Sequence, residues 1–185
     1  MNKITEKYNK LYARKNVFGA LPLPIVKRAE KYMFGRVLDI GAGQGRNALY
    51  LTKKFDVLAV DPSEVGLNSI RSKVGTLVGD VWSLPKTKFD AVVNTFVLHH
   101  LIPEEAIQMI KQLQRITNRG GIHTVAAFTQ DGEFYEARPD MFYLKGDELK
   151  DLYKNWEVLE YSKKKEKSHS GDMNTVAYLI ARKIK

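Results

Sequence analysis

The chain has 185 residues, of which 44% are hydrophobic, and it carries 30 lysines and arginines against 21 aspartates and glutamates. This length and apolar content predict one globular domain with a sizeable core. The sequence contains no cysteine, which excludes disulfides, thiolate metal sites and a cysteine nucleophile. No apolar run approaches the ~20 residues of a membrane-spanning helix, and the lysine-rich N-terminus lacks the apolar core of a signal peptide, so we expect a cytoplasmic protein.

The positive charge is concentrated near the N-terminus. The net charge is +9, and residues 1–36 contribute +7 of it, because nine lysines and arginines there face only Glu6 and Glu30. One interpretation is a surface that binds nucleic acid or an anionic substrate. The other is a solvated, lysine-rich helix face, which is favoured because lysine dominates over arginine and no recognised binding module accompanies the charge.

The apolar periodicity predicts two helices followed by alternating strands and helices. Residues 3–14 and 25–34 have helical spacing, with a proline-containing loop between them. The elements predicted after them are strand 36–40, helix 46–54, strand 56–60, helix 63–73, strand 75–79, strand 89–95, helix 103–117 and strand 122–128. This order predicts a parallel sheet with right-handed crossovers.

The C-terminal part of the pattern differs. Helix 146–154 is followed by strand-like runs at 156–161 and 173–182, with the polar, lysine-rich segment 162–172 between them. Two strands with no helix between them can pair antiparallel at one edge of a sheet. The expected fold class is therefore α/β, a Rossmann-like and mostly parallel sheet with an antiparallel C-terminal edge hairpin and helices on both faces.

A glycine-rich turn is the strongest functional signal. The strand that contains Asp39 breaks at Gly41, Gly43 and Gly45 and resumes as a helix, so that backbone N–H groups can approach a ligand closely. A second carboxylate, Asp61, follows the next strand, 20 residues after Gly41. A carboxylate at this place can accept hydrogen bonds from both hydroxyls of a ribose. Together these features predict a nucleoside cofactor.

The spacing of the glycines distinguishes between cofactors. The dinucleotide fingerprint G-x-G-x-x-G/A requires a small third residue for close helix–strand packing, and that position holds Arg46. Asp39 suits a cationic ligand, whereas the pyrophosphate of NAD favours N–H donors without a nearby carboxylate. The turn resembles motif I, D-x-G-x-G-x-G, of the class I S-adenosylmethionine methyltransferases. The resemblance implies a seven-stranded sheet in the order 3-2-1-4-5-7-6 and S-adenosylmethionine as the cofactor.

The chain also resembles the tellurite-resistance methyltransferase family of small cytoplasmic enzymes over most of its length. Residues 41–51 match G-x-G-x-G-R-N-S/A-x-x-L, and residues 144–157 resemble a K-E-G-E-L-R-x-Y-Y-x-x-W-E stretch. Tyr12, followed by Phe18-Gly19, resembles the N-terminal lid segment of the relatives.

We therefore expect a single methyltransferase domain over residues 1–185. Its N-terminal helical lid segment is expected at 1–34, and its Rossmann-like core at 35–185.

The expected cofactor site collects residues at the carboxyl ends of the strands, where open α/β sheets bind ligands. The methyltransferase class implies that Asp80 lies near the adenine amino group and Val81 against the ring. Tyr12 is expected to cover the methionine end, and Asp39 to act indirectly through water. The full set of expected cofactor-binding residues is Tyr12, Asp39, Gly41, Ala42, Gly43, Gly45, Asp61, Pro62, Asp80, Val81, Asn94 and Phe96. Arg46 and Asn47 are expected to hydrogen-bond neighbouring loops more than the cofactor.

The four histidines have different expected roles. His123 lies within a strand and is interpreted as structural. His99 and His100 follow strand 89–95 at the expected pocket edge, where either can accept a substrate proton. The adjacent pair does not have metal-ligand spacing, so no metal site is expected. The resemblance implies that His169 is catalytic, because it lies at the same distance after the tryptophan as the family's active-site histidine, although Ser170 stands where the family has arginine. The catalytic candidates are His169 and His99.

The predicted function is in-line transfer of a methyl group from S-adenosylmethionine to a small molecule or an inorganic oxyanion, by a monomer or homodimer. Amino-methylases of adenine or glutamine carry [DN]-P-P-[FY] after the fourth strand, whereas this chain has Asn94-Thr95-Phe96. Two alternatives remain. One is an RNA or protein methyltransferase that uses the basic N-terminal face, and the other is a cofactor-binding regulator without catalytic activity.

Overall fold

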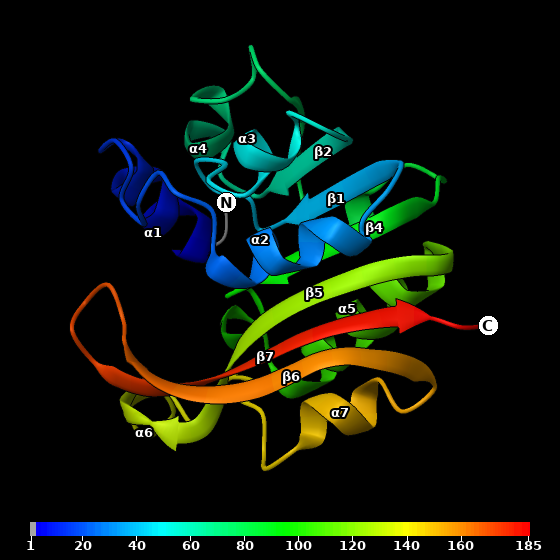
Figure 1. The fold of residues 1–185 in the computed structure, drawn as a ribbon. Helices are drawn as coiled ribbons and strands as arrows, with labels where there is room; N and C mark the ends of the chain where they lie inside the picture. The colour runs from blue at the N-terminus through cyan, green and yellow to red at the C-terminus, as the bar shows by residue number, and fades with distance from the viewer. Residues whose placement is uncertain (1–2) are drawn as a thin grey trace.

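A single twisted sheet organises the computed structural model, which describes residues 3–185 (Figure 1). Its strands are β1 (Arg36–Ile40), β2 (Asp56–Asp61), β3 (Gly75–Val78), β4 (Phe89–Thr95), β5 (Thr117–Gly132), β6 (Trp156–Lys167) and β7 (Met173–Lys183). They lie in the order β3-β2-β1-β4-β5-β7-β6, which is the order that the methyltransferase resemblance implied. The expected fold class is confirmed.

The strand pairing brings the carboxyl ends of β1, β2 and β4 to one edge of the sheet. β1 pairs in parallel with β2 on one side and with β4 on the other. β5 continues the parallel part, and β7 then runs antiparallel to both β5 and β6. Because parallel strands end at the same edge, the loops that follow β1, β2 and β4 converge there.

Helices cover both faces of the sheet. The α-helices are α1 (Lys3–Tyr12), α2 (Pro24–Ala29), α3 (Ala48–Leu51), α4 (Glu64–Asn68), α5 (Pro103–Arg115), α6 (Glu133–Ala137) and α7 (Glu148–Leu152), and the 3₁₀ helices are η1 (Glu30–Tyr32), η2 (Val81–Ser83) and η3 (Leu98–His100). None of the helices in residues 3–185 combines the length and the apolar character that crossing a membrane requires.

The core consists of two buried clusters, one on each face of the sheet. Val37 packs with residues of α2, α3 and α4, while its neighbour Leu38 packs with residues of α5 and α7. This alternation is the period of two expected for a strand buried on both faces. Both side chains are fully buried, so β1 and the turn that follows it rest on a rigid base.

Several boundaries differ from the sequence-based prediction, and the expected helices 46–54 and 63–73 are shortened to Ala48–Leu51 and Glu64–Asn68. α5 ends at Arg115 and not at residue 117, and β5 begins at Thr117 and not at residue 122, because Thr117 already pairs with Phe89 across a register shift. β6 extends to Lys167, because residues 162–167 pair with β7 and leave only a short loop of the predicted polar segment. α6 was not predicted.

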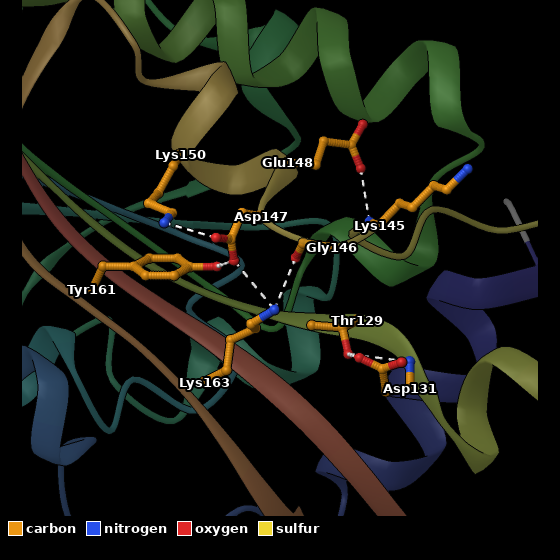
Figure 2. Close-up of polar contacts among 9 residues, drawn as sticks. All are labelled: Thr129, Asp131, Lys145, Gly146, Asp147, Glu148, Lys150, Tyr161 and Lys163. Atoms are coloured by element: carbon orange, nitrogen blue, oxygen red, sulfur yellow. Dashed lines mark hydrogen bonds and ion pairs between the residues drawn. The ribbon is translucent and has the colours of Figure 1, made fainter.

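A cluster around Asp147 attaches the start of α7 to β6 (Figure 2). The Asp147 carboxylate accepts hydrogen bonds from Lys150 at 2.7 Å, from the Tyr161 hydroxyl at 3.1 Å and from Lys163 at 3.2 Å. These hydrogen bonds lower the pKa of Asp147 to about 2. The Lys163 amine also donates to the Gly146 carbonyl oxygen. Residues 144–157, which carry much of the family resemblance, therefore attach the start of α7 to β6.

Candidate cofactor and acceptor site

A cavity of about 1340 Å³ lies at the carboxyl edge of the parallel strands. Its lining combines the turn after β1, the end of β2, the segments after β3 and β4, and parts of α1, α6 and the β6–β7 loop. Nine of the twelve expected cofactor residues line it: Tyr12, Gly41, Ala42, Gly43, Asp61, Pro62, Asp80, Val81 and Phe96. Both catalytic candidates, His99 and His169, line it as well.

The glycine turn presents bare backbone to this cavity. Gly41 and Gly43 have φ angles of +73° and +53°, which L-residues with side chains rarely adopt. A Cβ atom at Gly41 would lie 2.3 Å from a methyl carbon of Val97, and one at Gly43 would lie 2.5 Å from the Tyr12 hydroxyl. A side chain therefore fits at neither position.

Asp61 is held in place by the backbone on both sides. One carboxylate oxygen accepts a hydrogen bond from the Gly43 N–H, and the other accepts one from the Ser63 N–H, each at 2.8 Å. Burial raises the pKa of Asp61, while these two N–H donors oppose the rise. The carboxylate thus joins the turn after β1 to the start of α4 in a fixed orientation.

Asp80 caps the short helix η2 at the neighbouring part of the cavity. Its Oδ1 accepts hydrogen bonds from the backbone N–H groups of Trp82 at 2.9 Å and Ser83 at 3.1 Å. Val81 is buried behind it, and Trp82 is 56% exposed at the rim of the cavity. A carboxylate beside an apolar side chain is the combination that the class implies for the adenine end.

Asp39, Gly45 and Asn94 lie outside the cavity lining. Asp39 is 1% exposed, and burial raises its pKa to about 7, although the Ala48 N–H and the charge of Arg46 oppose this rise. Asn94 is also buried, and neither polar atom of its side chain has a hydrogen-bond partner among residues 3–185. Gly45 packs closely against Ile70 on the side of the turn away from the cavity, where an added Cβ would lie 2.6 Å from the Ile70 side chain.

The side chains between and after the glycines fasten the N-terminal segment. Gln44 donates to the Arg14 carbonyl oxygen at 2.7 Å and accepts a hydrogen bond from the Val17 N–H at 2.9 Å. The expected loop contacts are confirmed: Arg46 donates to the Phe18 carbonyl oxygen at 2.8 Å, and Asn47 accepts from the Leu23 N–H at 3.0 Å. The turn therefore fixes the backbone of the segment that follows α1.

Two tyrosines of α1 reach over the cavity. The Tyr12 ring lies against both Gly43 and Gly66, in a notch that a Cβ atom on either glycine would fill. Burial and the charge of Asp61 raise the pKa of the Tyr12 hydroxyl. The hydroxyl of Tyr8 lies 2.9 Å from Nε2 of His100. α1 is thus joined to η3, the short helix that follows β4.

The histidines divide into one structural residue and three at the cavity. His123 lies outside the cavity lining, with its two ring nitrogens 2.7 Å from the hydroxyls of Thr117 and Tyr153. Burial lowers its pKa to about 3, so the structural interpretation agrees with its surroundings. His99 is 8% exposed, and its Nδ1 has no hydrogen-bond partner within residues 3–185. Burial holds its pKa well below the usual value.

His169 lies on the β6–β7 loop, far along the chain from the glycine turn. The loop approaches the N-terminal segment, where the His169 ring lies 5.3 Å from the Phe18 ring in an edge-on arrangement. In Figure 1 the β6–β7 hairpin curves past the rest of the sheet on the side of α1. The hairpin therefore closes one side of the cavity.

Sequence reasoning missed an aromatic wall and a cation at the same end of the cavity. Phe128 on β5 and Phe134 on α6 both line the cavity, as does Arg138 immediately after α6. The sequence pattern around Phe128 is typical of an ordinary core residue of a strand. Phe134 and Arg138 were missed because α6 was not predicted. The spacing of four residues between Phe134 and Arg138, which places both on one side of a helix turn, was the available signal.

This sheet order, with a glycine turn after β1 and a carboxylate at the end of β2, defines the fold of the class I methyltransferases. The N-methyltransferase NodS from Bradyrhizobium japonicum WM9, solved with S-adenosyl-L-homocysteine, has a TM-score of 0.77, and the match covers 100% of each chain at 12% identity, which shows the fold alone. The chain belongs to the family described as Tellurite resistance protein TehB, whose model matches residues 3–180.

Individual relatives agree with this family. The probable S-adenosyl-L-methionine-dependent methyltransferase TehB of Haemophilus influenzae (strain 10810) is 34% identical over 148 residues, which cover 75% of this chain and 52% of the relative. The crystal structure of TehB from Haemophilus influenzae has a TM-score of 0.77 at 27% identity, over 97% of this chain and 66% of that chain. The chain thus spans about half the length of the curated relative.

Proposed function

We propose that the chain transfers a methyl group from S-adenosylmethionine to a small acceptor, either a small molecule or an inorganic oxyanion. The observation that carries the proposal is the placement of the bare backbone of Gly41 and Gly43 and the carboxylate of Asp61 around one cavity. The relatives named as probable S-adenosyl-L-methionine-dependent methyltransferases support the same cofactor.

The residues around the cavity fit this cofactor. A carboxylate has about four lone-pair sites, so Asp61 can bind ribose hydroxyls while it keeps its two backbone hydrogen bonds. The hydrogen bonds that the Asp80 carboxylate accepts from residues 3–185 go to Oδ1, so its other oxygen is available to the adenine amino group. Ala42, between the two glycines, and Pro62, next to Asp61, also line the cavity, and Tyr12 covers the methionine end.

The three residues behind the lining have supporting roles in this proposal. Gly45 gives the turn its shape, and Asp39 and Asn94 carry buried polar atoms without partners among the described residues. An unsatisfied buried polar group costs roughly 1–3 kcal/mol. Asp39 acts on the ligand through a bridging water, as the sequence predicts.

S-adenosylmethionine, when bound, supplies a methyl group that its sulfonium activates for displacement. The task of the chain is to align the acceptor and to exclude water, which can contribute up to ~7–11 kcal/mol by positioning alone. His99 is uncharged near neutral pH because burial lowers its pKa, and it lines the cavity, so its imidazole is one candidate to take a proton from a protonated acceptor. His169 is the second candidate for this proton, from the opposite wall.

Thermal unfolding with added ligand tests the proposal. S-adenosylmethionine and S-adenosylhomocysteine at 100 times their dissociation constants should each stabilise the chain by about 2.7 kcal/mol, whereas NAD should have no effect. Asp61→Asn should lose most of this shift. Its matched control is Asp56→Asn, which changes the exposed first residue of the same strand. A shift with NAD alone would contradict the proposal.

Three further predictions accompany this function. We propose a single domain with residues 1–34 as a lid, a cytoplasmic location, and a monomer or homodimer. The measurements are limited proteolysis, fractionation of cells that express the chain, and light scattering of the purified protein.

A further inference from the structure

One end of the cavity is walled by aromatic rings. The Phe128 ring centre lies 5.1 Å from that of Phe96, 4.9 Å from that of Phe134 and 4.9 Å from that of His99. The rings of His99 and Phe134 are nearly parallel, with an interplanar angle of 19° at 6.2 Å. All four residues line the cavity. Flat apolar faces of this kind stack favourably on another planar ring.

A cation lies beside this wall. Arg138 follows Phe134 by four residues, and both line the cavity. The positive charge of Arg138 lowers the pKa values of His99 and His100, which places the guanidinium near the same wall. Arg28 and Arg46, which also line the cavity, already bind Glu160 and the Phe18 carbonyl oxygen. No carboxylate of residues 3–185 forms an ion pair with Arg138.

We propose that this end of the cavity selects a planar aromatic acceptor that carries an anionic group, with the ring against Phe134 and His99 and the anion on Arg138. The inference rests on the proposed function and names the class of acceptor for that site. Arginine binds carboxylates in a planar, bidentate manner. The cavity is also larger than the ~300–1,000 Å³ usual for one drug-sized ligand, so it has room for an organic acceptor beside a nucleoside cofactor.

An inorganic oxyanion fits this end less well. Such an ion is strongly hydrated, and it gains nothing from the rings of Phe96, Phe128 and Phe134 while it loses part of its hydration beside them. Arg138 and Lys7, whose charges both act on His99, would attract it, but the apolar faces would then have no partner. The combination of rings and positive charge matches an acceptor that has both a planar apolar face and an anionic group.

For a thiol acceptor the reaction balances as follows. The sulfur, once deprotonated, forms a bond to the methyl carbon, and the bond from that carbon to the sulfonium sulfur breaks. S-adenosylhomocysteine leaves as a neutral thioether, and the thiol proton goes to His99 or to solvent. No oxidant or reductant is needed.

Four probes separate the contributions of ring and charge. 2-Mercaptobenzoate has a ring, a thiol and a carboxylate, thiophenol lacks the carboxylate, 3-mercaptopropionate lacks the ring, and selenite represents the inorganic oxyanions. We expect kcat/KM to be at least 10-fold higher for 2-mercaptobenzoate than for each of the other three. Methylated products are measured by mass spectrometry, and S-adenosylhomocysteine is measured in the same samples.

Two variants assign the preference to residues. Arg138→Gln should raise KM for 2-mercaptobenzoate by about 10- to 100-fold, as expected for a lost charged hydrogen bond, and should raise KM for thiophenol much less. Phe134→Leu should reduce the preference for 2-mercaptobenzoate over 3-mercaptopropionate. Arg115→Gln is the matched control, because Arg115 is an exposed arginine of α5 that does not line the cavity. Arg138→Lys, which keeps the charge, should recover part of the affinity for 2-mercaptobenzoate. Such a recovery would show that the loss in Arg138→Gln does not arise from misfolding.

The outcomes separate this inference from the proposed function. If S-adenosylmethionine binds but selenite is the preferred acceptor, the inference is overturned and the proposed function stands. The same holds if cofactor binds and 2-mercaptobenzoate is not methylated, or if Arg138→Gln affects thiophenol as much as 2-mercaptobenzoate. If no sulfur nucleoside binds, the proposed function itself fails, and the inference fails with it.

Discussion

The hydroxyl of Tyr8 and Nε2 of His100 lie 2.9 Å apart, although 92 residues separate them in the chain. Burial, with the charges of Arg138 and Lys7, lowers the pKa of His100 to about 4, so the ring is neutral near pH 7 and its Nε2 can accept a hydrogen bond from the Tyr8 hydroxyl. α1 is therefore held over the cavity by a hydrogen bond between two uncharged groups, which salt does not screen.

Removing this hydrogen bond should loosen α1. Tyr8→Phe is expected to lower the free energy of unfolding by about 0.5–1.5 kcal/mol, the net worth of one hydrogen bond. Urea denaturation measures this loss. Tyr135→Phe is the control, because no hydrogen bond of the Tyr135 hydroxyl occurs within residues 3–185. An equal loss in both variants would show that the Tyr8–His100 pair contributes nothing specific.

The same pair predicts a dependence of stability on pH. The pKa of His100 is about 4 in the folded chain against an ordinary value of 6.5, so the unfolded chain binds more protons between these values. Its contribution to stability is complete above pH 6.5 and is lost as the pH falls toward 4. Asp39, whose pKa is raised to about 7, acts in the opposite direction over the same range.

Because His100 and Asp39 act in opposite directions, the pH dependence of the wild-type stability does not isolate His100, and the test compares the wild type with a variant at position 100. His100→Gln should be less sensitive than the wild type to a change from pH 7 to pH 5, measured as the free energy of unfolding in urea. Two parallel curves would contradict the assigned direction of the His100 pKa.

The glycine turn offers a matched pair of substitutions. Gly41 and Gly120 have similar φ angles, +73° and +79°, but a Cβ at Gly41 would lie 2.3 Å from Val97, whereas one at Gly120 would have nothing within 4 Å. Both alanine variants should lose ~1 kcal/mol or more from backbone strain. Only Gly41→Ala should also lose the stabilisation by S-adenosylmethionine, measured by thermal unfolding. Retained stabilisation in Gly41→Ala would disprove the role of the turn.

The anchoring side chains predict a protease-sensitive variant. Gln44→Ala removes the hydrogen bonds to the Arg14 carbonyl oxygen and the Val17 N–H. Trypsin should then cleave after Arg14 or Lys15 several-fold faster than in the wild type, because cleavage requires local opening. Gln112→Ala on α5 is the control, since within residues 3–185 the side chain of Gln112 forms its hydrogen bonds with the exposed Arg115 side chain. An unchanged cleavage rate would show that other contacts hold the segment.

The sequence was sufficient to predict the sheet and one side of the site. Gly41, Gly43 and Asp61 carry local signals, namely glycines before a helix and a carboxylate at the end of an apolar strand. Their positions relative to one another follow from parallel pairing of neighbouring strands. The absence of a helix between the last two strands predicted their antiparallel pairing, and the methyltransferase resemblance supplied their order in the sheet.

The acceptor end could not be predicted in the same way. Phe134 and Arg138 reach the cavity through α6, a helix of five residues with weak local signals. The lysines of residues 162–167 suggested a loop, but long-range pairing with β7 makes this segment a strand. Asp39 and Asn94 lie on strands whose alternate side chains face away from the cavity, and sequence spacing does not reveal which face a ligand will use.

The side chains of Gln44, Arg46 and Asn47 have a consequence for how this motif can vary. The glycines of the turn are restricted by the space around their backbone, and the residues among and after them are restricted by the chain segment that they hold. The same short run of sequence is therefore constrained both by the ligand turn and by the N-terminal segment. In a shortened chain that starts after residue 23, Gln44 and Arg46 would lose the backbone partners described above, and Asn47 would lose its bond to Leu23 but keep the one to Thr95. The order of the ligand turn therefore depends on the N-terminal segment.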